Sequence, residues 1–253
     1  MNISGNTVLI TGGATGIGFS LAQEFVRAGN DVIICGRRED KLAQARTKLP
    51  SLHTRVCDVS AVRSRETLHD FVVSHFPAIN VLVNNAGIQR MIDLRNGLSE
   101  LEAGGNEIEI NLTSTIYLSA LFVPTFLERR QAAIVNVSSG LGFVPIAVMP
   151  VYCATKAAIH SFSLSLRQQL RETPVKVFEV IPPTVDTELD AGARARRGQT
   201  YRGIAPDEVA TSVIPALRDD VFEVAIGQAA GLVEASRTRA GFEQAFDRMN
   251  RRA

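Results

Sequence analysis

Short apolar segments rich in β-branched residues alternate with helical patterns along most of this chain. Strands are predicted at residues 7–10, 31–35, 52–57, 79–83, 132–137, 175–181 and 222–226. Apolar residues spaced three and four apart predict helices at 17–28, 39–49, 64–76, 107–126, 152–173 and 206–217, the fourth kinked at Pro124. Such alternation implies parallel strands joined by right-handed crossovers and covered by helices on both faces. The sequence therefore predicts an α/β fold, a doubly wound parallel seven-stranded sheet in three α/β/α layers.

The chain is expected to form one domain over residues 1–253. No segment repeats with a period of roughly 20 to 50 residues, and no linker divides the chain. The formal net charge of +1 gives no reason to expect nucleic acid or an anionic membrane surface as a partner. No stretch reaches the roughly 18 uninterrupted apolar residues of a membrane span, and no signal sequence is visible at the start. We expect a cytoplasmic protein without membrane attachment.

The cysteines and histidines show no metal-ligand spacing. Three cysteines, an odd number, lie in or beside apolar runs and are interpreted as reduced packing residues. Cys153 lies next to a tyrosine, so a reactive thiol is the alternative there. The four histidines are scattered, so no catalytic metal is predicted.

A glycine-rich turn follows the first predicted strand. It reads Thr11-Gly12-Gly13-Ala14-Thr15-Gly16-Ile17-Gly18 and leads into a helix. Glycines allow the backbone to approach phosphate oxygens, and the helix N-terminus offers free N–H groups to them. The spacing differs from the common Gly-x-Gly-x-x-Gly, and a plain strand–helix turn is the alternative. The turn predicts a nucleotide-phosphate site.

Two more polar segments end predicted strands, Asn84-Asn85-Ala86-Gly87 and Ser138-Ser139-Gly140. Ligands of doubly wound sheets bind beyond the carboxyl ends of the strands, at the point where strand order reverses. The glycine turn and both segments are therefore expected to meet at one edge of the sheet.

Tyr152 and Lys156 lie four residues apart at the start of a predicted helix, so their side chains share one face. A nearby ammonium favours the phenolate and lowers the pKa of a tyrosine from about 10. The pair suggests acid/base chemistry, although an ordinary helical spacing without function is the preferred explanation when the pair is taken alone.

Taken together, these elements resemble the short-chain dehydrogenase/reductase family, in its short single-domain branch. The resemblance spans about residues 7–187 and rests on the glycine turn, Asn84 to Gly87, Asn111, and Ser139 with Tyr152 and Lys156. It implies a Rossmann-type sheet and an oxidoreductase that interconverts a carbonyl and an alcohol of a small molecule by hydride transfer. A homodimer or homotetramer is also implied. The alternative is a non-catalytic nucleotide-binding regulatory or scaffold protein of the same fold.

The resemblance assigns roles to the catalytic residues. Tyr152 would be the general acid/base, and Lys156 would lower the pKa of Tyr152 and hold the nicotinamide ribose. Ser139 would donate a hydrogen bond to the substrate oxygen, with Ser138 as the competing choice. Asn111 would hold a water that connects Lys156 to solvent, and a packing or helix-bending Asn is the alternative.

The cofactor is predicted from charge. An NAD site usually carries Asp or Glu roughly 20 residues past the glycine turn. This chain has Gly36 there, followed by Arg37 and Arg38, which would hold a 2′-phosphate. NADP(H) is therefore preferred and NAD(H) is possible, the alternative being solvated arginines with Glu39 or Asp40 on the ribose. The expected cofactor contacts are Gly12, Thr15, Gly16, Ile17, Gly18, Arg37, Arg38, Asp58, Asn84, Ala86, Gly87, Tyr152, Lys156, Pro182 and Thr187.

Two of the expected cofactor contacts could also have a structural role. Asp58 would contact adenine or cap a helix. Asn84 to Gly87 would support both the central strand and the adenosine side of the cofactor.

Several segments bear on the substrate. The chain has Pro182-Pro183 where the family commonly has Pro-Gly, so the resemblance does not predict the geometry of the loop beside the nicotinamide. Glycines interrupt residues 88–106. A lid is predicted at about 188–205, where a cluster of arginines would either attract an anionic substrate or stay solvated: Arg194, Arg196, Arg197 and Arg202. An apolar pocket wall is expected from Phe143, Val144, Pro145 and Met149. The tail residues Phe242, Phe246 and Met249 would pack on a partner subunit or on their own core.

Overall fold

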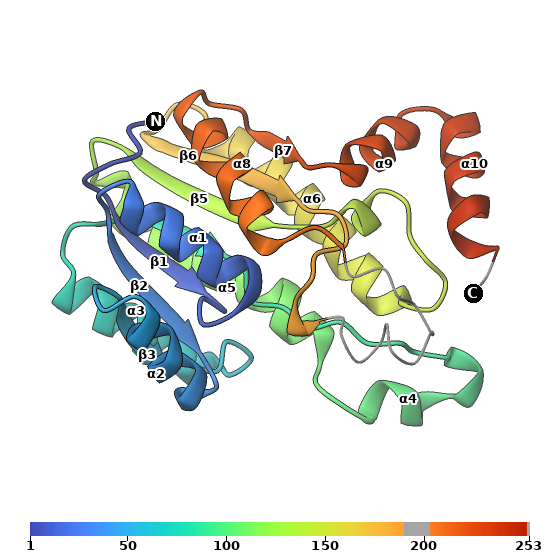
Figure 1. The fold of residues 1–253 in the computed structure, drawn as a ribbon, viewed down its shortest axis with the longest axis horizontal. Helices are drawn as coiled ribbons and strands as arrows, with labels where there is room; N and C mark the ends of the chain where they lie inside the picture. The colour runs from blue at the N-terminus through green and yellow to red at the C-terminus, as the bar shows by residue number, and fades with distance from the viewer. Residues whose placement is uncertain (190–202, 252–253) are drawn as a thin grey trace.

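The computed structural model, which describes residues 1–189 and 203–251, is built around a twisted sheet of seven parallel strands (Figure 1). The strands are β1 (Thr7–Thr11), β2 (Asp31–Gly36), β3 (His53–Val56), β4 (Ile79–Asn84), β5 (Ala132–Val137), β6 (Val175–Ile181) and β7 (Glu223–Ala225). Their order is β3-β2-β1-β4-β5-β6-β7. Strand order reverses between β1 and β4, so the ligand edge is expected beyond the carboxyl ends of these two strands. The predicted doubly wound sheet is confirmed.

Helices cover both faces of the sheet, as the alternation predicts. The helices are α1 (Gly16–Arg27), α2 (Glu39–Lys48), α3 (Val62–His75), α4 (Leu98–Glu102), α5 (Ser114–Leu127), α6 (Pro150–Gln169), α8 (Pro206–Arg218), α9 (Gln228–Ser236) and α10 (Arg239–Asn250). Three short turns of other types occur at Leu94–Asn96 (η1), Ile108–Thr113 (η2, a π-helix) and Gly140–Gly142 (η3). Helices α1, α2 and α8 pack on one face, and α3, α5 and α6 pack on the other (Figure 1).

The core lies on both sides of the sheet. Val8 and Ile10 of β1 face the layer of α1 and α8, whereas Leu9 faces the layer of α3, α5 and α6. All three are fully buried, because successive side chains of a strand point to opposite faces and both faces are covered. Such strands are largely apolar, which is why the central ones could be located from sequence, whereas β3 at the edge is exposed or half-buried.

The segment Ile108–Leu127 is long and apolar enough to span a membrane by length and composition alone. Here it joins η2 to α5 and packs in the α3 layer through Leu118, Phe122 and Phe126, as core helices also do. Pro124 lies inside α5, which continues to Leu127, so the helix does not end at the proline.

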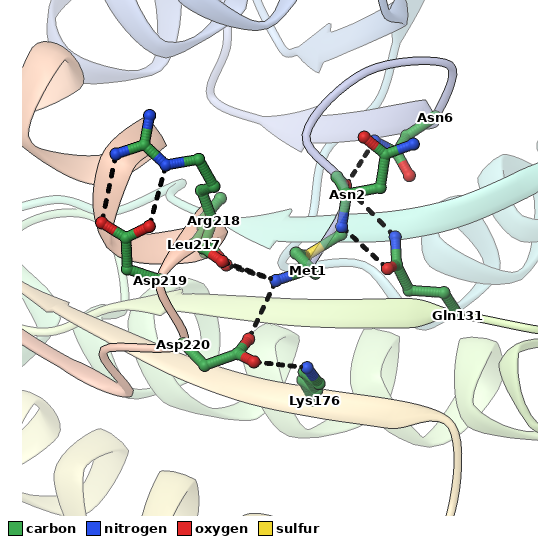
Figure 2. Close-up of polar contacts among 9 residues, drawn as sticks. All are labelled: Met1, Asn2, Asn6, Gln131, Lys176, Leu217, Arg218, Asp219 and Asp220. Carbon is green, nitrogen blue, oxygen red and sulfur yellow. Dashed lines mark hydrogen bonds and ion pairs between the residues drawn. The ribbon is translucent and has the colours of Figure 1, made fainter.

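The first residue anchors the edge where the strands begin, opposite the ligand edge (Figure 2). The ammonium of Met1 donates to the carbonyl oxygens of Leu217 (2.8 Å) and Arg218 (3.1 Å) and pairs with Asp220 Oδ1 (2.9 Å). Asp220 also pairs with Lys176 Nζ at the start of β6 (2.7 Å). A positive charge at the C-terminus of α8 is favourable because the last carbonyls of a helix are unpaired and carry partial negative charge.

The C-terminal helices α9 and α10 lie beyond the carboxyl ends of the strands (Figure 1). The rings of Phe242 and Phe246 stack with centroids 5.8 Å apart on α10, which packs on α9. Asn250 connects α10 to the loop before α6, because its side chain donates to Pro145 O (3.2 Å) and accepts from Ala147 N (2.6 Å). The tail thus contacts the loop between β5 and α6 of its own chain.

Candidate active site

A cavity of about 450 Å³ opens at the carboxyl ends of the central strands. The walls combine the glycine turn, the start of α2, the segment after β4, the end of β5 and the first turns of α6. The lining residues are Gly12, Ala14, Thr15, Gly16, Ile17, Gly36, Arg37, Arg38, Cys57, Val59, Asn85, Ala86, Gly87, Ile88, Gln89, Ile110, Val137, Ser138, Tyr152, Lys156, Pro182, Thr187, Glu188 and Leu189. A wider groove of about 930 Å³ between α2 and β3 contains none of the predicted site residues, so we take the smaller cavity as the candidate site.

The glycine turn needs its glycines for two different reasons. Gly16 has φ of +55°, which other residues rarely adopt, and a Cβ there would lie 2.9 Å from Thr187 Cγ2. A Cβ at Gly18 would lie 2.4 Å from Gly12 O and 2.5 Å from Asn85 Nδ2. Gly18 therefore packs the turn together and does not line the cavity, whereas Gly12 and Gly16 do.

Thr11 and Asn85 hold the turn against the end of β4. Thr11 Oγ1 accepts hydrogen bonds from the N–H groups of Asn85 and Ala86, both at 3.0 Å. Asn85 Nδ2 donates to Thr11 O (2.9 Å) and Gly12 O (3.2 Å). Asn85 also lines the cavity and was missing from the predicted contacts, although it belongs to the polar segment that drew attention to this edge.

Besides Gly18, two predicted cofactor contacts lie away from the cavity wall. Asn84 is buried and donates to Ser119 Oγ (3.2 Å) and Asn136 Oδ1 (2.9 Å), so it ties β4 to α5 and β5. Asp58 Oδ1 accepts from Ser60 N (2.9 Å) and Ser60 Oγ (2.7 Å), which uses its carboxylate in the turn before α3. This is a contact within the turn and not the helix cap considered as the alternative, because the N-cap residue of α3 is Ala61.

Tyr152 and Lys156 share one face at the start of α6, which begins at Pro150, a favourable first residue for a helix. Both are buried, with exposures of 6% and 4%, and Lys156 Nζ lies 5.6 Å from the centroid of the Tyr152 ring. Lys156 Nζ also donates to Val137 O (2.8 Å). Burial lowers the pKa of Lys156 to about 8, and the charge of Glu179 acts in the opposite direction. A pKa of about 8 leaves the lysine mostly charged at neutral pH, not far below the pH at which it loses its proton.

The two serines after β5 have different surroundings. Ser138 Oγ donates to the buried carboxylate of Glu179, although Ser138 also borders the cavity. Ser139 Oγ accepts from Leu141 N (3.1 Å) and caps η3. The hydrogen of the Ser138 hydroxyl is thus engaged, whereas Ser139 Oγ is the acceptor in its bond to Leu141 N, so its hydrogen can be donated to another acceptor.

Asn111 lies in the π-helical turn η2 and is fully buried. Its side chain accepts from Ile88 N (2.8 Å) and donates to Ile88 O (2.9 Å) and Thr155 Oγ1 (3.1 Å). A Cβ at Gly87 would lie 3.3 Å from Asn111 Oδ1 and 3.8 Å from Lys156 Nζ, so both groups face the same glycine. Single π-turns recur at functional sites because they reorient one side chain of a helix.

Arg37 and Arg38 stand at the far end of the cavity. Arg38 Nη1 pairs with Glu188 Oε2 at 2.7 Å, and Arg38 Nη2 lies 3.5 Å from Thr15 Oγ1. A Cβ at Gly36 would meet no atom within 4 Å, so the space beside this glycine is open, and Gly36 lines the cavity together with both arginines.

The remaining predicted segments are only partly described. Residues 190–202, with the four arginines of the predicted lid, lie outside the described residues. Pro182 lines the cavity, and its carbonyl accepts from Gly140 N (3.2 Å).

An apolar patch lies beside the Tyr152 ring. Met149 and Cys153 pack with Tyr152, together with Met91, Leu141, Ile146 and Val148. Burial raises the pKa of the Cys153 thiol, consistent with packing rather than reactivity. Phe143 turns instead toward His160, at 4.4 Å between ring centroids. Over residues 1–189 and 203–251, no three His, Cys, Asp or Glu side chains gather as a metal site.

A family model for short chain dehydrogenases matches residues 6–198. The chain belongs to the short-chain dehydrogenase family. It is 49% identical over 250 residues to DltE, an uncharacterized oxidoreductase of Bacillus subtilis (strain 168), which covers 99% of this chain and 98% of that protein. The two matches confirm the resemblance to the short-chain dehydrogenase/reductase family that the sequence predicts. The fold and the enzyme class, a short-chain oxidoreductase, are thereby established.

Solved structures of the family resemble this chain closely. A short chain dehydrogenase from Burkholderia cenocepacia J2315 in complex with NADP has a TM-score of 0.82 and 26% identity, covering 98% of this chain and 99% of the other. The closed form of serine dehydrogenase complexed with NADP+ has a TM-score of 0.73 and 29% identity, covering 82% and 87%.

Proposed function

We propose that this protein is an NADP(H)-dependent oxidoreductase that interconverts a carbonyl and an alcohol by hydride transfer, with Tyr152 as the general acid/base. The observation that carries the proposal is the burial of Tyr152 and Lys156 one helical turn apart, on the wall of the cavity that the glycine turn also lines. A buried phenol beside an ammonium is suited to proton transfer, because the ammonium favours the phenolate.

The cavity fits a nicotinamide dinucleotide in three respects. The turn at Gly12 and Gly16 offers bare backbone and the N-terminus of α1 to a diphosphate. Gly36, Arg37 and Arg38 line the same cavity, and guanidinium groups suit a 2′-phosphate. Both solved relatives of more than 25% identity described above carry NADP or NADP+. We therefore prefer NADP(H), with NAD(H) possible.

The residues of the chain would then act in sequence on the substrate oxygen. A bound NADPH supplies the hydride for reduction. Charge develops on the substrate oxygen, where the Ser139 hydroxyl donates a hydrogen bond and the Tyr152 hydroxyl donates the proton. Lys156 stabilises the resulting phenolate as long as it is charged, which requires a pH below about 8. Asn111 lies close enough to Lys156, across Gly87, to hold a water for proton return.

The site would take a small molecule with an apolar side, because Met149 and its neighbours pack beside the Tyr152 ring. All three cysteines are unpaired and buried, which supports a cytoplasmic protein. We also propose a homodimer or homotetramer, as the family resemblance implies, to be checked by light scattering.

Replacing Tyr152 by Phe tests the proposal. The variant should lose at least about a thousandfold in kcat in a screen of carbonyl compounds with NADPH, because the phenyl ring has no proton to transfer. The Kd for NADPH should change by less than about threefold. The control is Tyr117→Phe, which removes the hydroxyl of an exposed tyrosine on α5 and should keep full activity.

Unchanged turnover in Tyr152→Phe would refute the assignment. A wild-type protein that binds NADPH but reduces no carbonyl in a broad screen would instead favour the non-catalytic nucleotide-binding alternative.

A further inference from the structure

A polar row crosses four strands of the otherwise apolar sheet. The parallel register aligns Asn84 with Asn136, Asn136 with Glu179, and Glu179 with Glu223. The row lies on the face covered by α5 and α6, and three of its members bind α6. Asn136 donates to Ser163 Oγ (3.0 Å), Glu179 binds His160, and Glu223 pairs with Arg167 (3.1 Å). These contacts hold the helix that carries Tyr152 and Lys156.

Glu179 is the fully buried carboxylate of this row, with an exposure of 0%. Both of its oxygens are used: Oε1 accepts from Ser138 Oγ, and Oε2 lies 2.7 Å from His160 Nδ1. Burying a carboxylate is costly unless it is paired and hydrogen-bonded, and an apolar residue would fill this place in β6 more easily. A packing role alone does not explain Glu179.

The two partners of Glu179 belong to the two segments that carry the predicted catalytic residues. Ser138 immediately precedes Ser139 at the end of β5. His160 follows Lys156 by one turn of α6, so it lies on the same face of the helix. The carboxylate of Glu179 thus connects the turn after β5, which carries Ser139, to helix α6, which carries Lys156.

We propose that Glu179 is a positioning residue of the active site, which fixes the Ser139 turn through Ser138 and the Lys156 helix through His160. The proposal rests on the proposed function and extends it to a residue outside the cavity wall. The charge of Glu179 also reaches Lys156, whose pKa it raises against the lowering caused by burial. Glu179 therefore helps to keep Lys156 charged in the range where the ammonium is needed.

His160 connects this pair to solvent, since its side chain is 25% exposed. Its hydrogen bond to Glu179 raises the pKa of His160, and partial burial opposes this effect. Two more charges act on the imidazole: Glu223 of β7 raises its pKa and Arg167 of α6 lowers it. The Phe143 ring covers the remaining side.

The decisive experiment follows Lys156 itself. The chain has only four lysines, so 13C-labelled lysine side chains can be assigned and titrated by NMR, with Lys156→Met identifying the signal. Glu179→Gln keeps the shape of the side chain and an oxygen for Ser138 but removes the charge. We expect Lys156 to titrate at a lower pH in this variant than in the wild type. Glu223→Gln, a carboxylate of the same row that pairs with Arg167, should leave the Lys156 titration unchanged.

Turnover supplies the second readout. In Glu179→Gln, kcat should fall about tenfold or more with the Kd for NADPH nearly unchanged, and the alkaline limb of the pH profile of kcat should move to lower pH. His160→Asn places an amide near the position of Nδ1 and should keep most of the activity, whereas His160→Ala should resemble Glu179→Gln.

Outcomes of two kinds would overturn the proposal. One is a Lys156 titration that is the same in Glu179→Gln and wild type. The other is a Glu179→Gln protein that only melts at a lower temperature, with kcat and its pH profile unchanged. The NMR titration needs no substrate, so a wild-type protein without carbonyl reductase activity would count against the proposed function while Lys156 still reports on Glu179.

Discussion

The preference for NADP(H) can be tested at Arg38, whose surroundings allow an estimate of the effect. Arg38→Ala removes a guanidinium at the end of the cavity where a 2′-phosphate would lie. A hydrogen bond from a charged donor contributes about 1.5–3 kcal/mol. Arg38 must first give up its ion pair with Glu188, in which both side chains are about half exposed, worth about 0.2–1 kcal/mol. The difference is about 1–2 kcal/mol, or a loss of roughly 5- to 30-fold in NADPH affinity.

The same reasoning predicts how the other arms of the experiment should behave. NADH has no 2′-phosphate, so its Kd should change by less than about twofold in Arg38→Ala. Glu188→Gln removes the competing carboxylate and should tighten NADPH binding by up to roughly fivefold. Arg46→Ala, an exposed arginine on α2 that lines only the wider groove, is the control and should change neither affinity.

Dissociation constants from the fluorescence of NADPH and NADH, measured at one fixed ionic strength, decide the matter. Equal weakening of both cofactors in Arg38→Ala would show that Arg38 supports the cavity rather than a 2′-phosphate. Tighter binding of NADH than of NADPH by the wild type would refute the cofactor preference itself.

Two further predictions concern the glycine turn and the stability of the fold. Gly18→Ala should destabilise the protein and weaken NADPH binding, because the new Cβ would lie 2.4 Å from Gly12 O, whereas Gly36→Ala meets no atom within 4 Å and should be neutral in thermal unfolding. Asp220→Asn should cost a few tenths to about 1 kcal/mol at pH 7, because the carboxylate is 40% exposed and its ion pairs are screened by solvent. The hydrogen bond from Lys176 and the ammonium of residue 1 lower the pKa of Asp220, so its contribution is present above pH 4 or so and is lost as the pH falls through the folded pKa. Unfolding curves that differ between wild type and Asp220→Asn as much at pH 2 as at pH 7 would contradict this account.

Local patterns in the sequence predicted the elements that hold most of the site. The central strands β1, β2, β4 and β5 are largely apolar and buried on both faces, so their existence and order along the chain were visible, and the ends of all seven strands differ from the prediction by at most one residue. Tyr152 and Lys156 belong to one helical turn, so their proximity follows from spacing alone. The two short helices α4 and α9 were not predicted, because glycines interrupt the first region and the second has little apolar periodicity.

Contacts between distant strands could not be predicted in the same way. Glu179 lies inside an apolar strand, and its partners are Ser138 and His160, which are 41 and 19 residues away along the chain. Nothing local indicates that Asn84, Asn136 and Glu179 share one register, because register is set by the packing of whole strands. The sequence does show a charged residue, Glu179, in the middle of a strand that is otherwise expected to be apolar and buried. Such a residue indicates that the strand has a polar partner at that position.

The polar row also explains how this edge of the sheet can carry a buried lysine. An ammonium at 4% exposure is disfavoured by desolvation, which is why the pKa of Lys156 falls to about 8. Val137 O accepts one of its hydrogen bonds, and Glu179 supplies the opposing charge. Without that carboxylate the lysine is expected to lose its proton at lower pH, which would narrow the pH range in which it favours the Tyr152 phenolate. In the mechanism proposed above, the charge of Glu179 in β6, outside the cavity wall, thus helps to keep Lys156 protonated at neutral pH.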